Sequence, residues 1–254
     1  MKLLTFIVNT GSFEKSEFTL NELRKREYLN RKDFQIYFFC WNEFHRENIS
    51  IYENYSNVKV IFKKYSLYKA INYLHNLSNS YFINVLHEGE EIYIDSSDIK
   101  DILVKNKSKL ISFDYVLRSD SISPKEKYVY GNFCQNYYSM LCPHVTAFLP
   151  NKIYKNYSYD NKFKIIADYV LFSKLRRNIP DFNKQYLNIP FCSFTYGGNS
   201  TRLSSLLSIM KEHIRYDLKT KRFSKNIFNL IFLTKFAVMS FYNRIMMLNW
   251  ENFE

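Results

Sequence analysis

The sequence is poor in the residues that interrupt regular structure. Its 254 residues include only five glycines and five prolines, and 46% of the chain is hydrophobic. Disordered chains show the opposite balance, with few apolar residues and many polar and structure-breaking ones. We therefore expect a folded chain, long enough for one large domain or for one domain with an appendage.

Cysteine is also scarce, and no CxxC pair occurs. The four cysteines are Cys40, Cys134, Cys142 and Cys192. This usage favours a reduced, cytoplasmic protein over a disulfide-stabilised one. The first residues, "MKLLTFIVNTGS", contain a six-residue apolar core and no A-x-A-like cleavage site, so we interpret residues 3–8 as a buried strand and not as a signal peptide.

The sequence does not favour a dedicated nucleic-acid-binding protein, although its net charge is +12. Such a charge suits nucleic acid, an anionic membrane or a phosphorylated substrate. However, no block of five or more Lys/Arg, no zinc-finger spacing and no RNP-like signature occurs. The many aromatics, 22 Tyr and 23 Phe, fall largely in strand-like runs. We expect no nucleic-acid partner; a steep salt dependence of DNA or RNA binding would support that rival.

Apolar strand-like runs alternate with helical stretches. The expected strands are residues 3–8, 34–41, 58–64, 81–87 and 109–120. The expected helices are residues 16–28, with Ser16 as N-cap and Phe18, Leu20 and Leu23 as apolar positions, 66–79, and 167–177. This alternation predicts an α/β fold with a mainly parallel sheet flanked by helices. Ligands would then bind beyond the carboxyl ends of the strands, at the loops 9–12, 40–45 and 87–91.

A clean membrane-spanning run is missing from the basic C-terminal part. Residues 202–247 contain nine Lys/Arg against two acids, and Asn229 and Lys235 interrupt the run "IFNLIFLTKFAVMSFYNRIMML". We expect two parts, a domain of residues 1–201 and a helical extension of residues 202–254. The extension suits a membrane surface, or it packs back on the domain as an ordinary final helix.

Three segments contain residues that could bind a ligand, and each also has an ordinary structural explanation. In "HEGEE" (87–91), acids follow a buried strand, where they can hold a hard cation or form a solvated turn. In "CPHVTAFLPNKIY", His144 precedes an apolar stretch, and a lone histidine is more often structural than a ligand. By spacing alone, "FTYGGNST" with Gly197 and Gly198 is a turn.

One aspartate stands in an otherwise apolar run, "FKIIADYVLFSKL". Asp168 fits a helix start, where a carboxylate stabilises the helix dipole. It also fits a partly desolvated carboxylate that takes a proton from a hydroxyl group. The run alone favours the structural role, because structural carboxylates outnumber catalytic ones.

Taken in order, these stretches resemble the family 2 glycosyltransferases with a GT-A fold, in particular small bacterial enzymes of polysaccharide and lipopolysaccharide assembly. The stretches are "SLYKAINYLHNLSNSYFINVLHEGEE", "MLCPHVTAFLPNKIYK", "YDNKFKIIADYVLFSKL" and "IPFCSFTYGGNST", and the resemblance spans about residues 1–205. It implies transfer of a sugar, with inversion, from a nucleotide-sugar to a glycan or polyprenyl-diphosphate-linked acceptor.

The resemblance also assigns roles to individual residues. Asp168 matches the catalytic base, and Glu90 matches the acid that holds Mg²⁺ or Mn²⁺ on the donor diphosphate. His144, Gly197 and Gly198 match the acceptor side. The donor and nucleotide positions are Asn9, Thr10, Cys40, Lys69 and Glu88.

The donor half departs from the family pattern. Cys40 and Lys69 stand where aspartates are expected, Glu90 replaces an aspartate, and Val170 replaces the last acid of the "ADYD" motif. The function expected is a glycosyltransferase of cell-surface polysaccharide assembly, cytoplasmic and peripheral on the inner face of the cell membrane. The rival is an inactive homologue that binds a partner or a glycan.

Overall fold

The computed structural model describes residues 1–40, 50–118, 128–130, 144–179, 183–195 and 205–220. The chain divides into two compact units, residues 1–195 and 196–254, so the first ends six residues before the boundary expected from the sequence. Gly197 and Gly198 lie outside the described residues.

The first unit alternates strands and helices. The strands are β1 (Lys2–Thr10), β2 (Phe34–Cys40), β3 (Val58–Phe62), β4 (Ser80–His87), β5 (Leu110–Arg118), β6 (Tyr128–Tyr130), β7 (Ala147–Pro150) and β8 (Lys184–Thr195). The helices are α1 (Phe13–Lys25), α2 (Ser50–Glu53), α3 (Leu67–Leu77), α4 (Ser96–Lys105), α5 (Asn151–Asn156) and α6 (Ala167–Asn178), with a short 3-10 turn, η2 (His144–Thr146).

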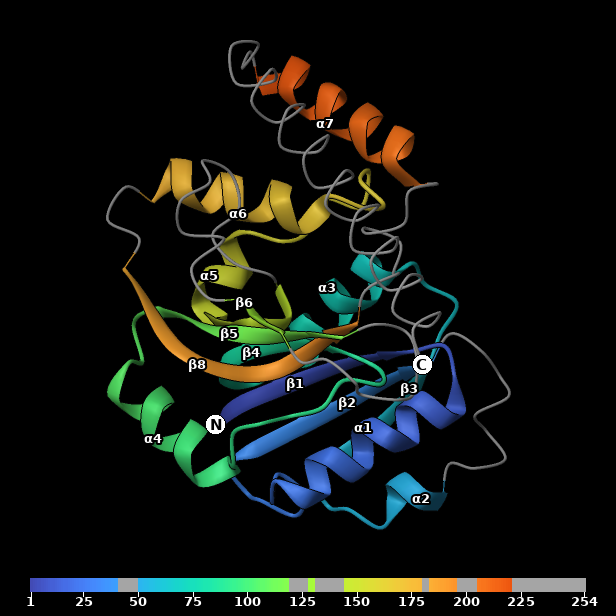
Figure 1. Ribbon diagram of the computed structural model, residues 1–254, viewed down its shortest axis with the longest axis vertical. Helices are drawn as coiled ribbons and strands as arrows, with labels where there is room; N and C mark the ends of the chain where they lie inside the picture. The colour runs from blue at the N-terminus through green and yellow to red at the C-terminus, as the bar shows by residue number, and fades with distance from the viewer. Residues whose placement is uncertain (41–49, 119–127, 131–143, 180–182, 196–204, 221–254) are drawn as a thin grey trace, which may run out of the picture. The chain divides into compact units, whose positions relative to one another are not determined.

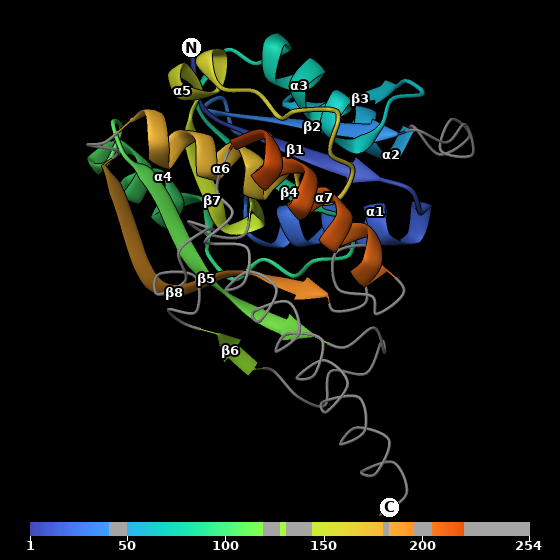
Figure 2. The same ribbon diagram turned by 90° about the horizontal axis from the view of Figure 1, so that it is seen from above.

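These strands form one eight-stranded sheet in the order β3-β2-β1-β4-β7-β5-β6, with β8 paired to β5. The β3-β2-β1-β4 half is parallel, as is the β5–β8 pair. Strand β7 runs antiparallel to both β4 and β5 and so joins the two halves. Helices α1, α2 and α4 lie on one face, and α3, α5 and α6 lie on the other (Figure 1; Figure 2 from above). The predicted α/β fold is confirmed.

Aromatic side chains fill the junction between the halves. Phe6 of β1 stacks on Phe191 of β8 with ring centroids 6.3 Å apart. Phe148 of β7 packs edge-on against both rings, at 6.3 and 4.8 Å. All three side chains are fully buried, and edge-to-face pairs of this kind add to the free energy gained from burial alone. The β7-β5-β8 part of the sheet is thereby packed against the parallel β3-β2-β1-β4 part.

The predicted start of the first helix was wrong. Helix α1 begins at Phe13, and Ser12 is its N-cap, with extended backbone and a hydroxyl that accepts from Lys15 N–H. The Ser16 hydroxyl instead donates to Ser12 O at 2.7 Å. Of the three apolar positions named from the sequence, Phe18 is exposed, whereas Leu20 and Leu23 are buried. The earlier start matters because it places the helix N-terminus at the end of β1.

The second unit is described through one helix, α7 (Leu206–Thr220). Its Ile209 and Tyr216 side chains are buried and lie seven residues, or about two helical turns, apart on one face. Leu207, Ile214 and Leu218 are exposed and share another face, since they are separated by seven and four residues. In the part of the chain that the structure describes, none of the helices combines the length and apolar character needed to span a bilayer.

Candidate active site

Asp168 lies in the first turn of α6, as the helix-start reading predicted. Its Oδ1 atom accepts the Tyr169 backbone N–H at 2.8 Å. The side chain is only 18% exposed, so the carboxylate is partly desolvated yet reachable from outside. A position at a helix N-terminus stabilises a carboxylate. The place of Asp168 at the start of α6 is therefore compatible with a role as a general base.

Two histidines extend from this carboxylate in a row. His144 Nδ1 lies 3.6 Å from Asp168 Oδ2, and His144 Nε2 lies 3.0 Å from His87 Nε2. The two rings are 4.8 Å apart and strongly inclined. Burial and the neighbouring His144 lower the pKa of His87 to about 3, against the opposing effect of Asp168. His87 is therefore neutral at physiological pH.

The backbone around His144 is held from β4 and β8. The Asn84 side-chain amide donates to Val145 O at 2.9 Å and to Ala147 O at 3.1 Å. Cys192 Sγ lies 3.9 Å from the same Val145 oxygen. Because Asn84 is buried, these bonds are not weakened by competing water. The 3-10 turn that carries His144 is consequently fixed to the sheet.

The strand ends β2, β1 and β4 lie side by side at one edge of the sheet. Asn9 is in register with Phe39 on one side and with His87 on the other. Its Oδ1 atom is buried and has no hydrogen-bond partner, which suits a position that receives a ligand. The Thr10 hydroxyl already has hydrogen-bond partners within the protein, because it lies 3.1 Å from both Phe39 O and Cys40 Sγ. Burial raises the pKa of the Cys40 thiol to about 11, so Cys40 is neutral.

Glu88 points to the N-terminus of α1. Its Oε2 atom accepts the backbone N–H groups of Gly11 at 2.8 Å and of Ser12 at 2.9 Å. The next residue, Gly89, has a φ of +82°, which favours glycine, and its N–H donates to the Thr19 hydroxyl. Glu88 thus fixes the β1–α1 turn, and its predicted role toward the donor stays a prediction.

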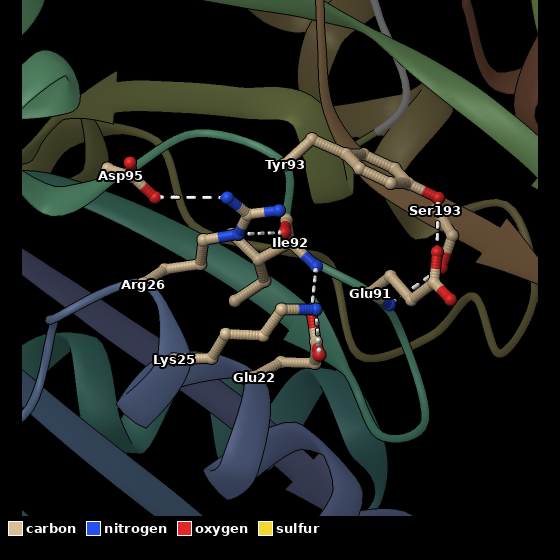
Figure 3. A network of polar contacts seen from close by, with 8 residues as sticks. All are labelled: Glu22, Lys25, Arg26, Glu91, Ile92, Tyr93, Asp95 and Ser193. Carbon is tan, nitrogen blue, oxygen red and sulfur yellow. Dashed lines mark hydrogen bonds and ion pairs between the residues drawn. The ribbon is translucent and has the colours of Figure 1, made fainter.

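The segment after this turn is clasped between α1 and β8 (Figure 3). Glu22 accepts the Ile92 N–H, and the Arg26 guanidinium donates to Ile92 O at 2.8 Å and pairs with Asp95 at 3.1 Å. On the other side, Glu91 N–H donates to the Ser193 hydroxyl at 2.8 Å. These contacts hold the loop at the end of β4 in one conformation.

Glu90 is turned into the protein and is 2% exposed. Burial raises the pKa of its carboxyl well above the usual range, opposed by hydrogen bonds to the His87 backbone and the Cys192 thiol. A neutral, enclosed carboxyl is a poor ligand for a hard cation. Among the described residues, no group of three His, Cys, Asp or Glu is placed to hold a metal ion. As arranged, the Glu90 carboxyl does not fit a divalent cation.

Lys69 lies on α3, with its ammonium 4.4 Å from the centre of the Tyr65 ring. It is exposed, and Tyr65 in turn stacks on Phe39 at the end of β2. Lys69 therefore flanks the same sheet edge as Asn9 without touching Asp168. Its role in donor binding is untested.

His87 is the residue that motif reasoning missed. It ends the buried strand β4, and a side chain at the carboxyl end of a parallel strand next to two others is well placed for a site. The strand pattern alone could therefore have indicated His87 as a site residue. Its contact with His144, which is 57 residues away in the sequence, could not be predicted from motif spacing.

The sheet order and the flanking helices match solved structures with a GT-A-like fold. No protein-family model and no curated protein matches the sequence. Among solved structures, S. aureus TarS 1–349 in complex with UDP is similar, with a TM-score of 0.60 at 16% identity over 84% of this chain and 65% of that chain.

Two further TarS structures show the same likeness. The longer TarS chain has a TM-score of 0.60 at 16% identity, over 84% of this chain and 39% of its own. TarS 1–349 in complex with UDP-GlcNAc has a TM-score of 0.56 at 16% identity, over 77% and 58%. This chain therefore spans less than two thirds of each of these three structures. At such low identity the likeness shows the fold.

Proposed function

We propose that this protein is an inverting glycosyltransferase that moves a sugar from a nucleotide-sugar to a glycan or polyprenyl-diphosphate-linked acceptor in cell-surface polysaccharide assembly. The observation that carries the proposal is Asp168: a partly exposed carboxylate on a GT-A-like fold, backed by His144 and close to the carboxyl ends of β1 and β4. The family 2 resemblance of the surrounding motifs supports the same assignment.

In the proposed reaction, Asp168 accepts the proton of an acceptor hydroxyl group. The oxygen forms a bond to the anomeric carbon while the bond from that carbon to the nucleoside diphosphate breaks. One such displacement inverts the configuration. General-base catalysis of this kind contributes about 10²- to 10⁴-fold to the rate.

A uridine diphosphate sugar is the first donor to test, because TarS structures hold UDP and UDP-GlcNAc. The buried, unpartnered Oδ1 atom of Asn9 offers an acceptor for a donor group at the strand ends. Thermal stabilisation of the protein by UDP, UDP-GlcNAc and other nucleotide-sugars would identify the donor, since a ligand that binds the folded state raises its stability.

The decisive variant is Asp168→Asn, with Asp160→Asn as matched control. Asp160 lies in the loop before α6 and pairs with Lys174 of that helix at 3.8 Å, away from the histidines. We expect Asp168→Asn to lower transfer at least about 100-fold while donor binding persists, and the control to remain active. Full activity of Asp168→Asn would remove it as the base.

The inactive-homologue alternative makes a different prediction. It rests on the departures at Cys40, Lys69 and Glu90. Cys40 and Glu90 are buried, and this burial raises the pKa of both side chains and so favours their neutral forms. Titration of UDP and other nucleoside diphosphates with Mn²⁺ and with EDTA separates the two. Absence of binding in both conditions would favour the alternative.

Attachment to a membrane surface is part of the proposal. The exposed face of α7 carries Leu207, Ile214 and Leu218, and the exposed Lys211 and Arg215 lie among them. Apolar side chains flanked by cations suit the boundary of an anionic bilayer. This arrangement would bring the enzyme to a lipid-linked acceptor.

A further inference from the structure

The distances in the Asp168–His144–His87 row indicate which of the two histidines donates the hydrogen bond between them. His144 Nδ1 is buried and makes no hydrogen bond, and Asp168 Oδ2 lies 3.6 Å from it. At this distance the negative carboxylate repels a bare nitrogen lone pair and attracts an N–H, so the arrangement favours a proton on Nδ1. In neutral His144 the opposite nitrogen, Nε2, then carries no proton and can only accept a hydrogen bond.

His87 is the group that meets this requirement. Its Nε2 atom lies 3.0 Å from His144 Nε2, a hydrogen-bond distance that two bare nitrogens would not adopt. One of the two must therefore hold the proton. With His144 Nδ1–H turned to Asp168, the proton belongs to His87, which donates.

We propose that His87 is a positioning residue of the active site, which donates to His144 Nε2 and thereby holds the His144 Nδ1–H toward the carboxylate of Asp168. The inference rests on the proposed function, because it assigns His87 a part in presenting the base. It needs no covalent step and no proton loss from the row.

The surroundings support a fixed row. His87 ends β4 and is followed by the clasped segment of Figure 3. His144 is on the turn anchored by Asn84, and Asp168 is in the first turn of α6. Phe194 of β8 lies beside His87, with ring centroids 6.5 Å apart. Three separate elements thus converge, and a shift of about 1 Å at such a site costs about 100-fold in rate.

Two variants of His87 test the inference. Glutamine places an amide N–H near the position of Nε2 and can donate to His144, whereas leucine cannot. We expect His87→Leu to lower kcat about 10- to 100-fold with little change in KM, and His87→Gln to retain most of the activity. A purely structural role would not distinguish them in kcat at equal folded fraction, which circular dichroism would verify.

The tautomer is measured without turnover by ¹⁵N NMR of the imidazoles. We expect His144 as the Nδ1–H form in the wild type and a mixture in His87→Leu. A wild-type His144 carrying its proton on Nε2, or an unchanged kcat in His87→Leu, overturns the inference. Full activity of Asp168→Asn instead overturns the proposed function, and the NMR result still decides the tautomer.

Discussion

His87 makes the stability of the fold depend on pH in a calculable way. Its pKa is about 3 in the folded protein and 6.5 as the ordinary value, because burial disfavours the charged ring. Between about pH 3 and pH 6.5, His87 therefore binds a proton in the unfolded chain and not in the folded protein. The stability contributed by neutral His87 is complete above pH 6.5 and is lost progressively as the pH falls toward 3.

The magnitude follows from the two pKa values. At pH 5 the pH lies 1.5 units below the ordinary histidine pKa of 6.5, and at about 1.4 kcal/mol per unit the loss of stability relative to pH 7.5 is about 2 kcal/mol. The figure is an upper one because the side chain of His87 is only partly enclosed. His87→Gln lacks the titrating group and removes this contribution.

The assay is urea unfolding of the wild type and His87→Gln at pH 7.5 and pH 5.0, followed by far-UV circular dichroism. Other titrating groups, including Glu90 with its opposite sign, are present in both proteins and cancel in the double difference. We expect the wild type to lose up to about 2 kcal/mol more than the variant. Equal losses in both proteins would show that His87 is not held neutral by its surroundings.

Three further predictions concern the site and the extension. Glu90→Gln should keep transfer within about twofold, because the buried carboxyl is already neutral; a loss of activity restored by added Mn²⁺ would instead make Glu90 a metal ligand. Asn84→Leu should destabilise the protein by about 1–3 kcal/mol, since two buried carbonyls lose their donor, and a smaller change in urea unfolding would contradict the anchoring of the His144 turn. The triple change of the α7 face to serine should weaken binding to anionic vesicles several-fold in sedimentation, with no loss for Ser208→Ala; unchanged binding would rule out that face. The residues replaced are Leu207, Ile214 and Leu218.

The parallel half of the fold could be predicted because its strands are mostly apolar runs, such as residues 3–8 and 82–86, and strands that are buried on both faces show this pattern. The start of α1 was harder, because Ser12 and Ser16 are equally good caps by type. Only the extended backbone at Ser12, with Glu88 bound to its N–H, decides between them.

The place of Asp168 in the fold was predictable from the local sequence, whereas contacts between distant residues were not. Asp168 stands alone in an apolar run and lies at the start of α6 as expected, and its role as the base, which the family resemblance assigns, stays a prediction. The orientation of Glu90 could not, because a positive φ at Gly89 separates Glu88, which faces α1, from Glu90, which is buried. The role of His87 depends on a contact with His144, and that contact exists only after β7 has joined the sheet.

The clasp around residues 91–95 has a consequence for synthesis of the chain. Its bonds reach back 70 residues to Glu22 and forward 102 residues to Ser193. A nascent chain that has emerged only through β7 already contains Asp168's partners His87 and His144, yet the Glu91 backbone still lacks Ser193. The loop that follows β4 is therefore completed only by β8, the last described strand of the first unit to leave the ribosome, and a product truncated before β8 would carry Asp168, His144 and His87 beside an unfinished loop.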